Sequence, residues 1–129
     1  MIRAALCSGG FVALATAALA DPSLECSVTA SSQVEIGNCL AVVEENLIPT
    51  LAIALDGARA SAQELDDITE RSVAVPALDA SQGAWEAYRD VQCDYAGSLF
   101  GGGSGAGIAI RSCRIEMTRD RIKDLSALR

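Results

Sequence analysis

The segment QGAWEAYRDVQC, residues 82–93, decides the fold, because its rare large side chains recur at helical spacing. It holds the only Trp of the chain and one of the two Tyr residues. Residues three or four apart share one face of a helix, so Gln82, Trp85, Arg89 and Cys93 can form one stripe, with Tyr88 beside it. We expect Trp85 and Tyr88 to lie in the core, and Arg89 to reach a carboxylate on a neighbouring helix. The structural motif consists of Gln82, Trp85, Tyr88, Arg89, Asp90 and Cys93.

Helical patterns also precede this segment. Ser32 and Glu35 have the spacing of a capping box, and apolar residues at helical intervals follow them. Pro49 cannot donate a backbone hydrogen bond, so we expect this helix to end or kink at residues 46–48. Helical composition resumes over 50–71. Its expected buried face comprises Leu51, Ala52, Leu55, Ala58, Ala62 and Leu65, and its solvated side Glu64, Asp66, Asp67 and Glu70.

The remaining segments complete the expected architecture. Residues 21–31 read as extended or irregular, a helix is expected over about 78–94, and residues 97–107 are too rich in Gly for a regular element. A last helix is expected from 107 or 108 almost to the end. Its buried stripe is Ile108, Ile115, Ile122 and Leu125, and its exposed basic face includes Arg114, Arg119, Arg121 and Lys123. With no strand pattern, the prediction is an all-α bundle of three to four antiparallel helices.

The amino terminus is typical of a secretory signal peptide. Arg3 supplies a positive start, residues 11–20 are almost wholly apolar or small, and Ala18-Leu19-Ala20 is a small-x-small cleavage site. The apolar run is shorter than the roughly 20 residues that a spanning helix needs. We therefore expect a signal peptide over 1–20, a mature domain over 21–129, and a periplasmic or secreted protein without a membrane anchor.

The number of cysteines is consistent with export to the periplasm or the cell exterior. Four remain after cleavage, and an even number in a small exported domain predicts two disulfides. Three pairings are possible, and we favour the local solution. It joins Cys26 to Cys39 and Cys93 to Cys113.

Charge and composition exclude several kinds of chemistry. The mature chain has 9 Lys and Arg against 17 Asp and Glu, a net charge of −8, which disfavours nucleic-acid binding and would attract a basic partner. The absence of His removes His-based catalytic pairs and His metal ligands. The acidic pairs at 44–45 and 66–67 read as solvated faces. We expect no catalytic residue, no metal and no cofactor.

The Gly-rich segment after Cys93 is the candidate binding element. It lacks the Gly-Lys-Ser/Thr ending of a phosphate loop, and no strand precedes it. A Cys93–Cys113 bridge would tie the two stems of this segment together. The segment is then either a simple connector between helices or a partner-binding loop. Its expected contact residues are Ser98, Leu99, Phe100 and Ser104, with Arg111 following in the last helix.

At these residues the chain resembles the LprI-like lysozyme-inhibitor family of small exported bacterial domains. The resemblance rests on the motif over 82–93, the Gly-rich segment, Cys113, Thr118-x-x-Arg121-x-x-x-Leu125 and the upstream Cys pair. Pro49 and the apolar run 51–55 depart from the family pattern, where a polar segment is expected. The resemblance implies a helical fold and inhibition of a lysozyme-type muramidase by protein contact. A protruding loop could block the cleft of such an enzyme with a hydroxyl or cation near its two catalytic carboxyl groups, and we expect Ser104 and Arg111 to supply these. The alternative is a structural or interaction module of the cell envelope that does not inhibit lysozyme.

Overall fold

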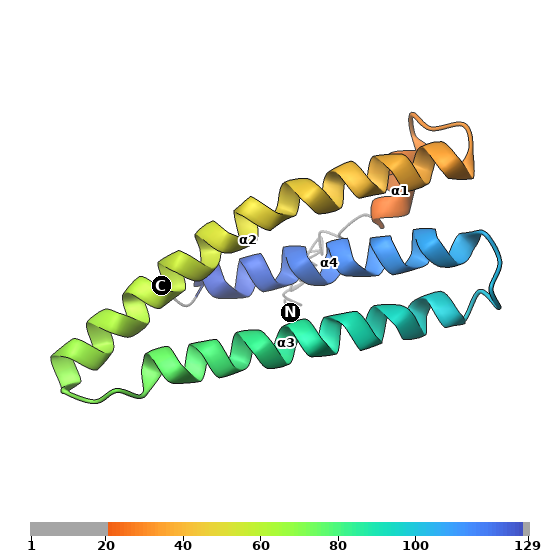
Figure 1. The fold of residues 1–129 in the computed structure, drawn as a ribbon. Coiled ribbons are helices and arrows are strands. Elements are labelled where there is room, and N and C mark those ends of the chain that lie inside the picture. The colour runs from red at the N-terminus through yellow and green to blue at the C-terminus, as the bar shows by residue number, and fades with distance from the viewer. Residues whose placement is uncertain (1–20, 128–129) are drawn as a thin grey trace, which may run out of the picture.

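Four helices follow one another in the computed structural model, which describes residues 21–127. They are α1 (Pro22–Ser27), α2 (Gln33–Thr69), α3 (Ala74–Ser98) and α4 (Gly105–Ala127), and no strand occurs within those residues (Figure 1). The predicted all-α bundle is thus confirmed, although α3 and α4 begin earlier than expected. The predicted signal peptide over 1–20 lies outside the described residues.

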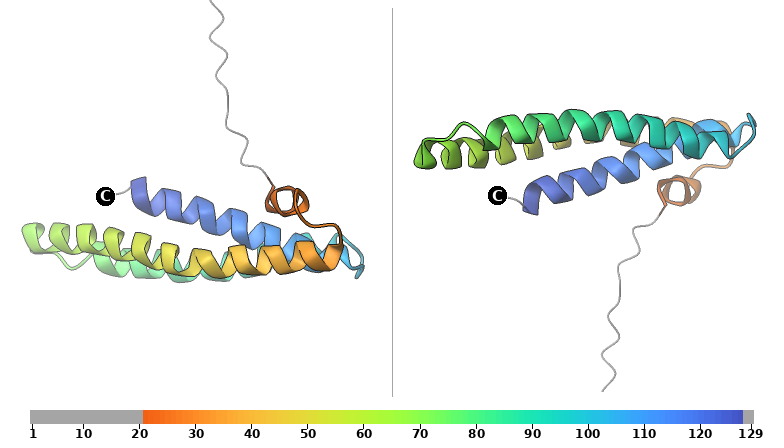
Figure 2. Two further views of the ribbon diagram at one scale, coloured as in Figure 1. Left: turned by 90° about the horizontal axis from the view of Figure 1, so that it is seen from above. Right: turned by 90° about the horizontal axis from the view of Figure 1, so that it is seen from below.

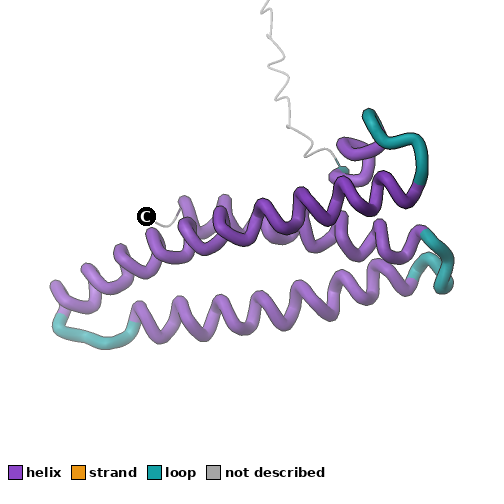
Figure 3. The backbone as a smooth tube through the Cα atoms, turned by 45° about the horizontal axis from the view of Figure 1, so that its top comes forward, coloured by secondary structure: helices purple, strands orange, loops and turns teal. Residues whose placement is uncertain are grey.

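The three long helices run antiparallel in sequence order. α2 and α3 lie side by side, and α4 packs against both on one side of that pair, where α1 also lies against α2 and α4 (Figures 1 and 2). The α1–α2 and α3–α4 connections meet at one end of the bundle, while the α2–α3 turn lies at the other (Figure 3). α4 therefore contacts every other helix.

The short helix α1 corrects the expectation of an irregular start. Asp21 is its N-cap and accepts a hydrogen bond from the Ser23 N–H at 2.8 Å, while Pro22 occupies the first turn. Pro is favoured there because its fixed φ suits the helix and its missing N–H would have had no helical partner. Asp-Pro was therefore a start signal.

The long helix α2 begins as predicted but does not end at Pro49. The Ser32 and Glu35 side chains form the reciprocal capping box at its start. Pro49 lies inside the helix, and Figure 1 shows the ribbon curving gently without interruption. Pro49 is solvent-exposed, so water can hydrate the carbonyl that loses its donor, and the Thr50 hydroxyl donates to the Asn46 carbonyl at 3.3 Å. The expected helix end was wrong because a proline on the solvent side can be accommodated.

By length and composition alone α2 is also apolar enough to cross a membrane. Only 11% of its most apolar 18-residue window is buried in the bundle. The buried face of α2 packs against α4 and contributes Leu40, Ala54 and Ala58 to the interior.

The α2–α3 corner depends on Asp66, which was expected on the solvated side and is instead 8% exposed. Its carboxylate accepts hydrogen bonds from the backbone N–H groups of Val73, Ala74 and Val75 at 3.0, 2.8 and 3.0 Å. These bonds hold the pKa of Asp66 below its usual value, Ala74 and Val75 contributing most. Asp66 therefore caps α3 from the end of α2, which the local sequence of α3 does not reveal.

The apolar interior forms two clusters, both shared between α2 and α4. Cys26, Leu40 and Ile115 make up the first, and Ala54, Ala58 and Leu125 the second. Ile108 and Ile122 pack against these clusters, in line with the predicted α4 stripe. On α2 the expected face was partly wrong, since Leu65 is 54% exposed and Ala52 is exposed. The last turns of α2 extend beyond the end of α4 in Figure 1, whereas Ala52 is exposed although Ala54, two residues on, packs against Leu125 of α4.

Candidate functional site

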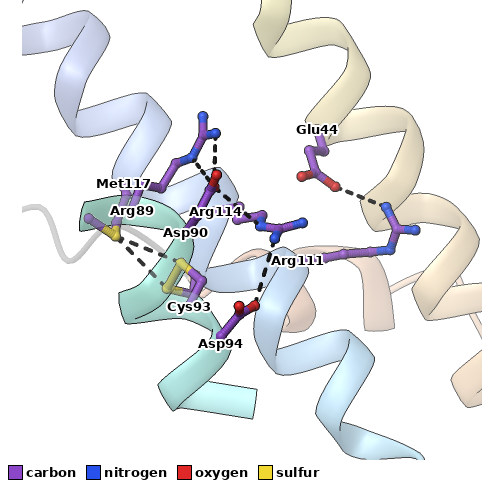
Figure 4. A network of polar contacts seen from close by, with 9 residues as sticks. Glu44, Arg89, Asp90, Cys93, Asp94, Arg111, Arg114 and Met117 are labelled. Atoms are coloured by element: carbon purple, nitrogen blue, oxygen red, sulfur yellow. Dashed lines mark hydrogen bonds and ion pairs between the residues drawn. A yellow bond between two sulfur atoms is a disulfide. The ribbon is translucent and has the colours of Figure 1, made fainter. Parts of the chain in front are cut away.

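Two disulfides fix the end of the bundle that carries α1 and the Gly-rich loop. Cys26 pairs with Cys39 and Cys93 with Cys113, the local pairing favoured from the sequence. The first joins α1 to α2 and the second joins α3 to α4. Cys93 is fully buried, and the Met117 sulfur lies 3.7 Å from its Sγ (Figure 4). Because disulfide sulfurs carry no proton, this is a packing contact between polarisable atoms.

The motif around Trp85 joins α3 to α4. The half-buried Trp85 ring lies near two guanidinium groups, with the Arg89 and Arg121 carbons 5.0 and 5.8 Å from its centroid. Arg121 Nε also donates to the Gln82 side-chain oxygen at 3.0 Å, and Gln82 is 7% exposed. Gln82 and Trp85 thus anchor an α4 arginine, a partner that the sequence pattern did not indicate.

Two expectations for this motif were wrong. Tyr88 is 56% exposed, and its hydroxyl lies 3.5 Å from the Gln92 side-chain oxygen, so it is not a core residue. Trp85 is only half buried, because α4 covers one part of the stripe and solvent meets the rest. The stripe is wider than the surface that one neighbouring helix can cover.

Arg89 also departs from expectation, since it pairs with its own neighbour. Its Nε and Nη2 atoms donate to Asp90 Oδ1 at 3.1 and 3.0 Å. The cation that crosses from the other helix is Arg114, whose Nε lies 3.9 Å from Asp90 and whose Nη2 lies 3.8 Å from Asp94 (Figure 4). At such distances these are loose ion pairs rather than hydrogen bonds.

The arginines of α4 connect it to all three other helices. Arg111 Nη1 donates to Glu44 Oε2 on α2 at 2.9 Å, and Arg119 forms a two-pronged pair with Glu25 on α1, with both distances 2.8 Å. The hydrogen bond from Arg119 lowers the pKa of Glu25. The basic face of α4, expected to be exposed or to lie against the acidic second helix, is therefore largely engaged within the bundle. Glu44 is a salt-bridge partner rather than part of a solvated face.

The Gly-rich loop is a short, exposed turn at the bundle end. Only residues 99–104 lie outside the helices, and Gly101 and Gly102 adopt φ values of 59° and 80° that favour glycine. Ser98, Phe100 and Ser104 are exposed there. The Phe100 ring also lies over Gly105, where an added Cβ would come within 2.8 Å of it. Leu99 is exposed as well, so the structure gathers four of the five candidate contact residues, while Arg111 lies further along α4 in its pair with Glu44.

Within residues 21–127, no three Cys, Asp or Glu side chains are close enough together to hold a metal ion. Most of these polar contacts join two helices and hold the bundle together, whereas the Arg89–Asp90 and Tyr88–Gln92 pairs lie within α3. What distinguishes this end chemically is an exposed loop with disulfide-linked stems.

This architecture defines a small, disulfide-stapled helical scaffold. The chain belongs to the LprI lysozyme inhibitor family, whose model, described as "Lysozyme inhibitor LprI", matches residues 25–125. It is also 33% identical over 104 residues to "Uncharacterized protein R02472" of Rhizobium meliloti (strain 1021), covering 77% of this chain and 75% of that protein. No solved structure matches the chain.

Proposed function

We propose that this protein is an exported, non-enzymatic binding protein that inhibits lysozyme-type muramidases by direct contact. The observation that carries the proposal is the match to a lysozyme inhibitor family over residues 25–125, which include all three long helices almost completely.

The proposed compartment is the periplasm or the cell exterior, reached by cleavage of a signal peptide after Ala20 to leave a domain over 21–129. Two disulfides support this, because they persist in oxidising compartments and are rare in a reducing cytosol. The net charge of −8 expected after cleavage would speed encounter with a basic lysozyme.

The proposed contact surface is the loop end of the bundle. Ser98, Phe100 and Ser104 are exposed on or beside a turn whose stems are joined through Cys93 and Cys113. Because the disulfide already restricts the turn, binding a partner would cost little additional conformational entropy. The catalytic cleft of a lysozyme carries two carboxyl groups, which a hydroxyl such as that of Ser104 could approach. Arg111 would have to exchange Glu44 for a partner carboxylate in order to take part.

The test is lysis of cell walls by lysozyme, followed as turbidity, with increasing amounts of purified protein. We expect inhibition, weakened at least about tenfold by the double substitution Phe100→Ala, Ser104→Ala if those side chains form part of the contact. Ile68→Ala, an exposed apolar truncation at the opposite end of the bundle, is the matched control and should inhibit normally. Undiminished lysis at a large molar excess of the wild-type protein would refute the function.

One observation favours the alternative, a cell-envelope interaction module that does not inhibit lysozyme. The loop has only six residues outside helices, and its aromatic side chain partly packs down on Gly105. A turn this short offers little that can enter a deep cleft. Stable binding of a different envelope protein through the same loop residues, combined with unchanged lysozyme activity, would identify this alternative.

A further inference from the structure

A pocket of about 420 Å³ opens at the base of the Gly-rich loop. All four helices contribute to its wall, because α1 and the start of α2 approach the end of α3 and the first turns of α4 there. Its lining includes Asp21, Gln33, Phe100, Ile108, Ser112 and Glu116.

The pocket carries carboxylates that the ion pairs of the bundle leave unbalanced. Burial raises the pKa of Glu116, and the nearby carboxylates of Asp21 and Asp120 raise it further. Arg119, the cation that opposes this rise, is already paired with Glu25. The lining residues that α2 and α3 contribute, Gln33 and Ala96, carry no charge. A cation entering this pocket would therefore be attracted to Glu116 and Asp21.

A second, independent feature also indicates a missing partner. Ser112 lines the same pocket and is only 8% exposed, yet its hydroxyl oxygen has no hydrogen-bond partner among the described residues. Buried polar groups are normally paired, and an orphan is costly unless a ligand or water satisfies it.

The other residues that line the pocket indicate whether the cation is a metal ion or an organic group. The carboxylates do not form a group able to hold a metal ion, whereas the Phe100 ring and the Ile108 side chain suit an aliphatic stem or a planar guanidinium. We propose that this pocket receives an arginine or lysine side chain of the protein partner, an inference that rests on the proposed binding function. Phe100 would then belong to both the loop and the pocket.

The first experiment measures binding of purified protein to immobilised lysozyme. Glu116→Gln keeps the shape of the side chain and removes its charge, and we expect it to weaken binding at least about tenfold, as loss of a charge-assisted contact does. Glu64→Gln makes the same change at an exposed position near the far end of α2 and should alter binding less than about twofold. Thermal melting followed by circular dichroism checks that both variants fold. Equal binding by the two variants would overturn the proposal.

The second experiment does not require lysozyme, so it separates failure of the pocket from failure of the proposed function. N-acetylarginine amide is added to protein with its native amino terminus while the Glu116 carboxyl is titrated by NMR, with the neutral citrulline analogue as control. We expect the arginine derivative alone to lower the pKa of Glu116. No change would overturn the proposal. It is also overturned if acetylating the protein's own α-amino group raises the pKa of Glu116, because the terminus would then already occupy the pocket.

Discussion

Two glycines of α3 allow a sharp test of the packing between α3 and α4. At Gly97 an added Cβ would meet Ile110 Cγ1 at 2.5 Å, Ile110 Cδ1 at 2.7 Å and the Ala106 carbonyl oxygen at 3.3 Å. At Gly83 nothing lies within 4 Å of that position. The same substitution, Gly→Ala, should therefore have opposite effects on the free energy of unfolding at two positions in one helix.

The magnitudes follow from two competing terms. Alanine is favoured over glycine inside a helix by about 0.8–1 kcal/mol, so Gly83→Ala should stabilise by roughly that amount. Gly97→Ala gains less from helix propensity, because residue 97 lies in the last turn of α3. Overpacking of the new methyl group against Ile110 costs about 1–3 kcal/mol. We expect a net destabilisation of about 1–2 kcal/mol.

Urea unfolding followed by circular dichroism measures both variants against the wild type. Thermal midpoints should move in opposite directions, by about 4 °C for each kcal/mol in a domain of this size. A Gly97→Ala protein as stable as Gly83→Ala would refute the close approach of α3 and α4, and with it the helix placement that positions the loop.

Three further predictions concern the other supports of the fold. Replacing both Cys93 and Cys113 by Ala should lower the free energy of unfolding by about 3 kcal/mol, the loop-closure value for a 20-residue separation, and a urea midpoint equal to that of the wild type would contradict it. Ile115→Ala should cost about 2–5 kcal/mol because Ile115 is fully buried, whereas Ile68→Ala, at 73% exposure, should stay within about 0.5 kcal/mol; similar melting of the two would disprove the core assignment. The lowered pKa of Asp66 means that its contribution to stability is complete above its unfolded pKa and is lost as pH falls through its folded pKa. Asp66→Asn should therefore reduce the melting temperature at neutral pH and flatten its decline in acid, while Asp67→Asn, an exposed neighbour, should do neither.

Local signals were sufficient for much of the fold. The spacing of Ser32 and Glu35 located the start of α2 because a capping box involves only residues within one turn. The local Cys pairing and the apolar stripe of α4 were likewise predictable, since both depend on short separations or on helical periodicity. Asp21-Pro22 was an equally local start signal for α1 that was passed over.

The remaining features depend on tertiary context. Pro49 would be expected to end a helix that packs on no other element. In α2, residues before Pro49 (Leu40) and after it (Ala54 and Ala58) pack against α4, so the helix continues. Asp66 and Glu44 resemble surface acids in sequence. Their partners, the α3 backbone for Asp66 and Arg111 for Glu44, come from other helices and are visible only in the fold. Tyr88 lies beside the stripe that holds Gln82 and Trp85, and periodicity could not say how far α4 covers that side of the helix. For the candidate site, the loop was recognisable from its glycines, whereas the Glu116 pocket brings together residues from all four helices and has no local signature.

The position of α4 also matters for biogenesis. A ribosome releases the chain from its amino terminus, so the segment that joins every other helix is the last to emerge. The ring closed by Cys26 and Cys39 needs only the first two helices, but Leu40, Ala54 and Ala58 have no α4 surface to cover them until α4 has been synthesised. A stop codon between residues 99 and 104 would therefore leave an α2–α3 hairpin whose buried α2 face has no covering helix, rather than a smaller working domain.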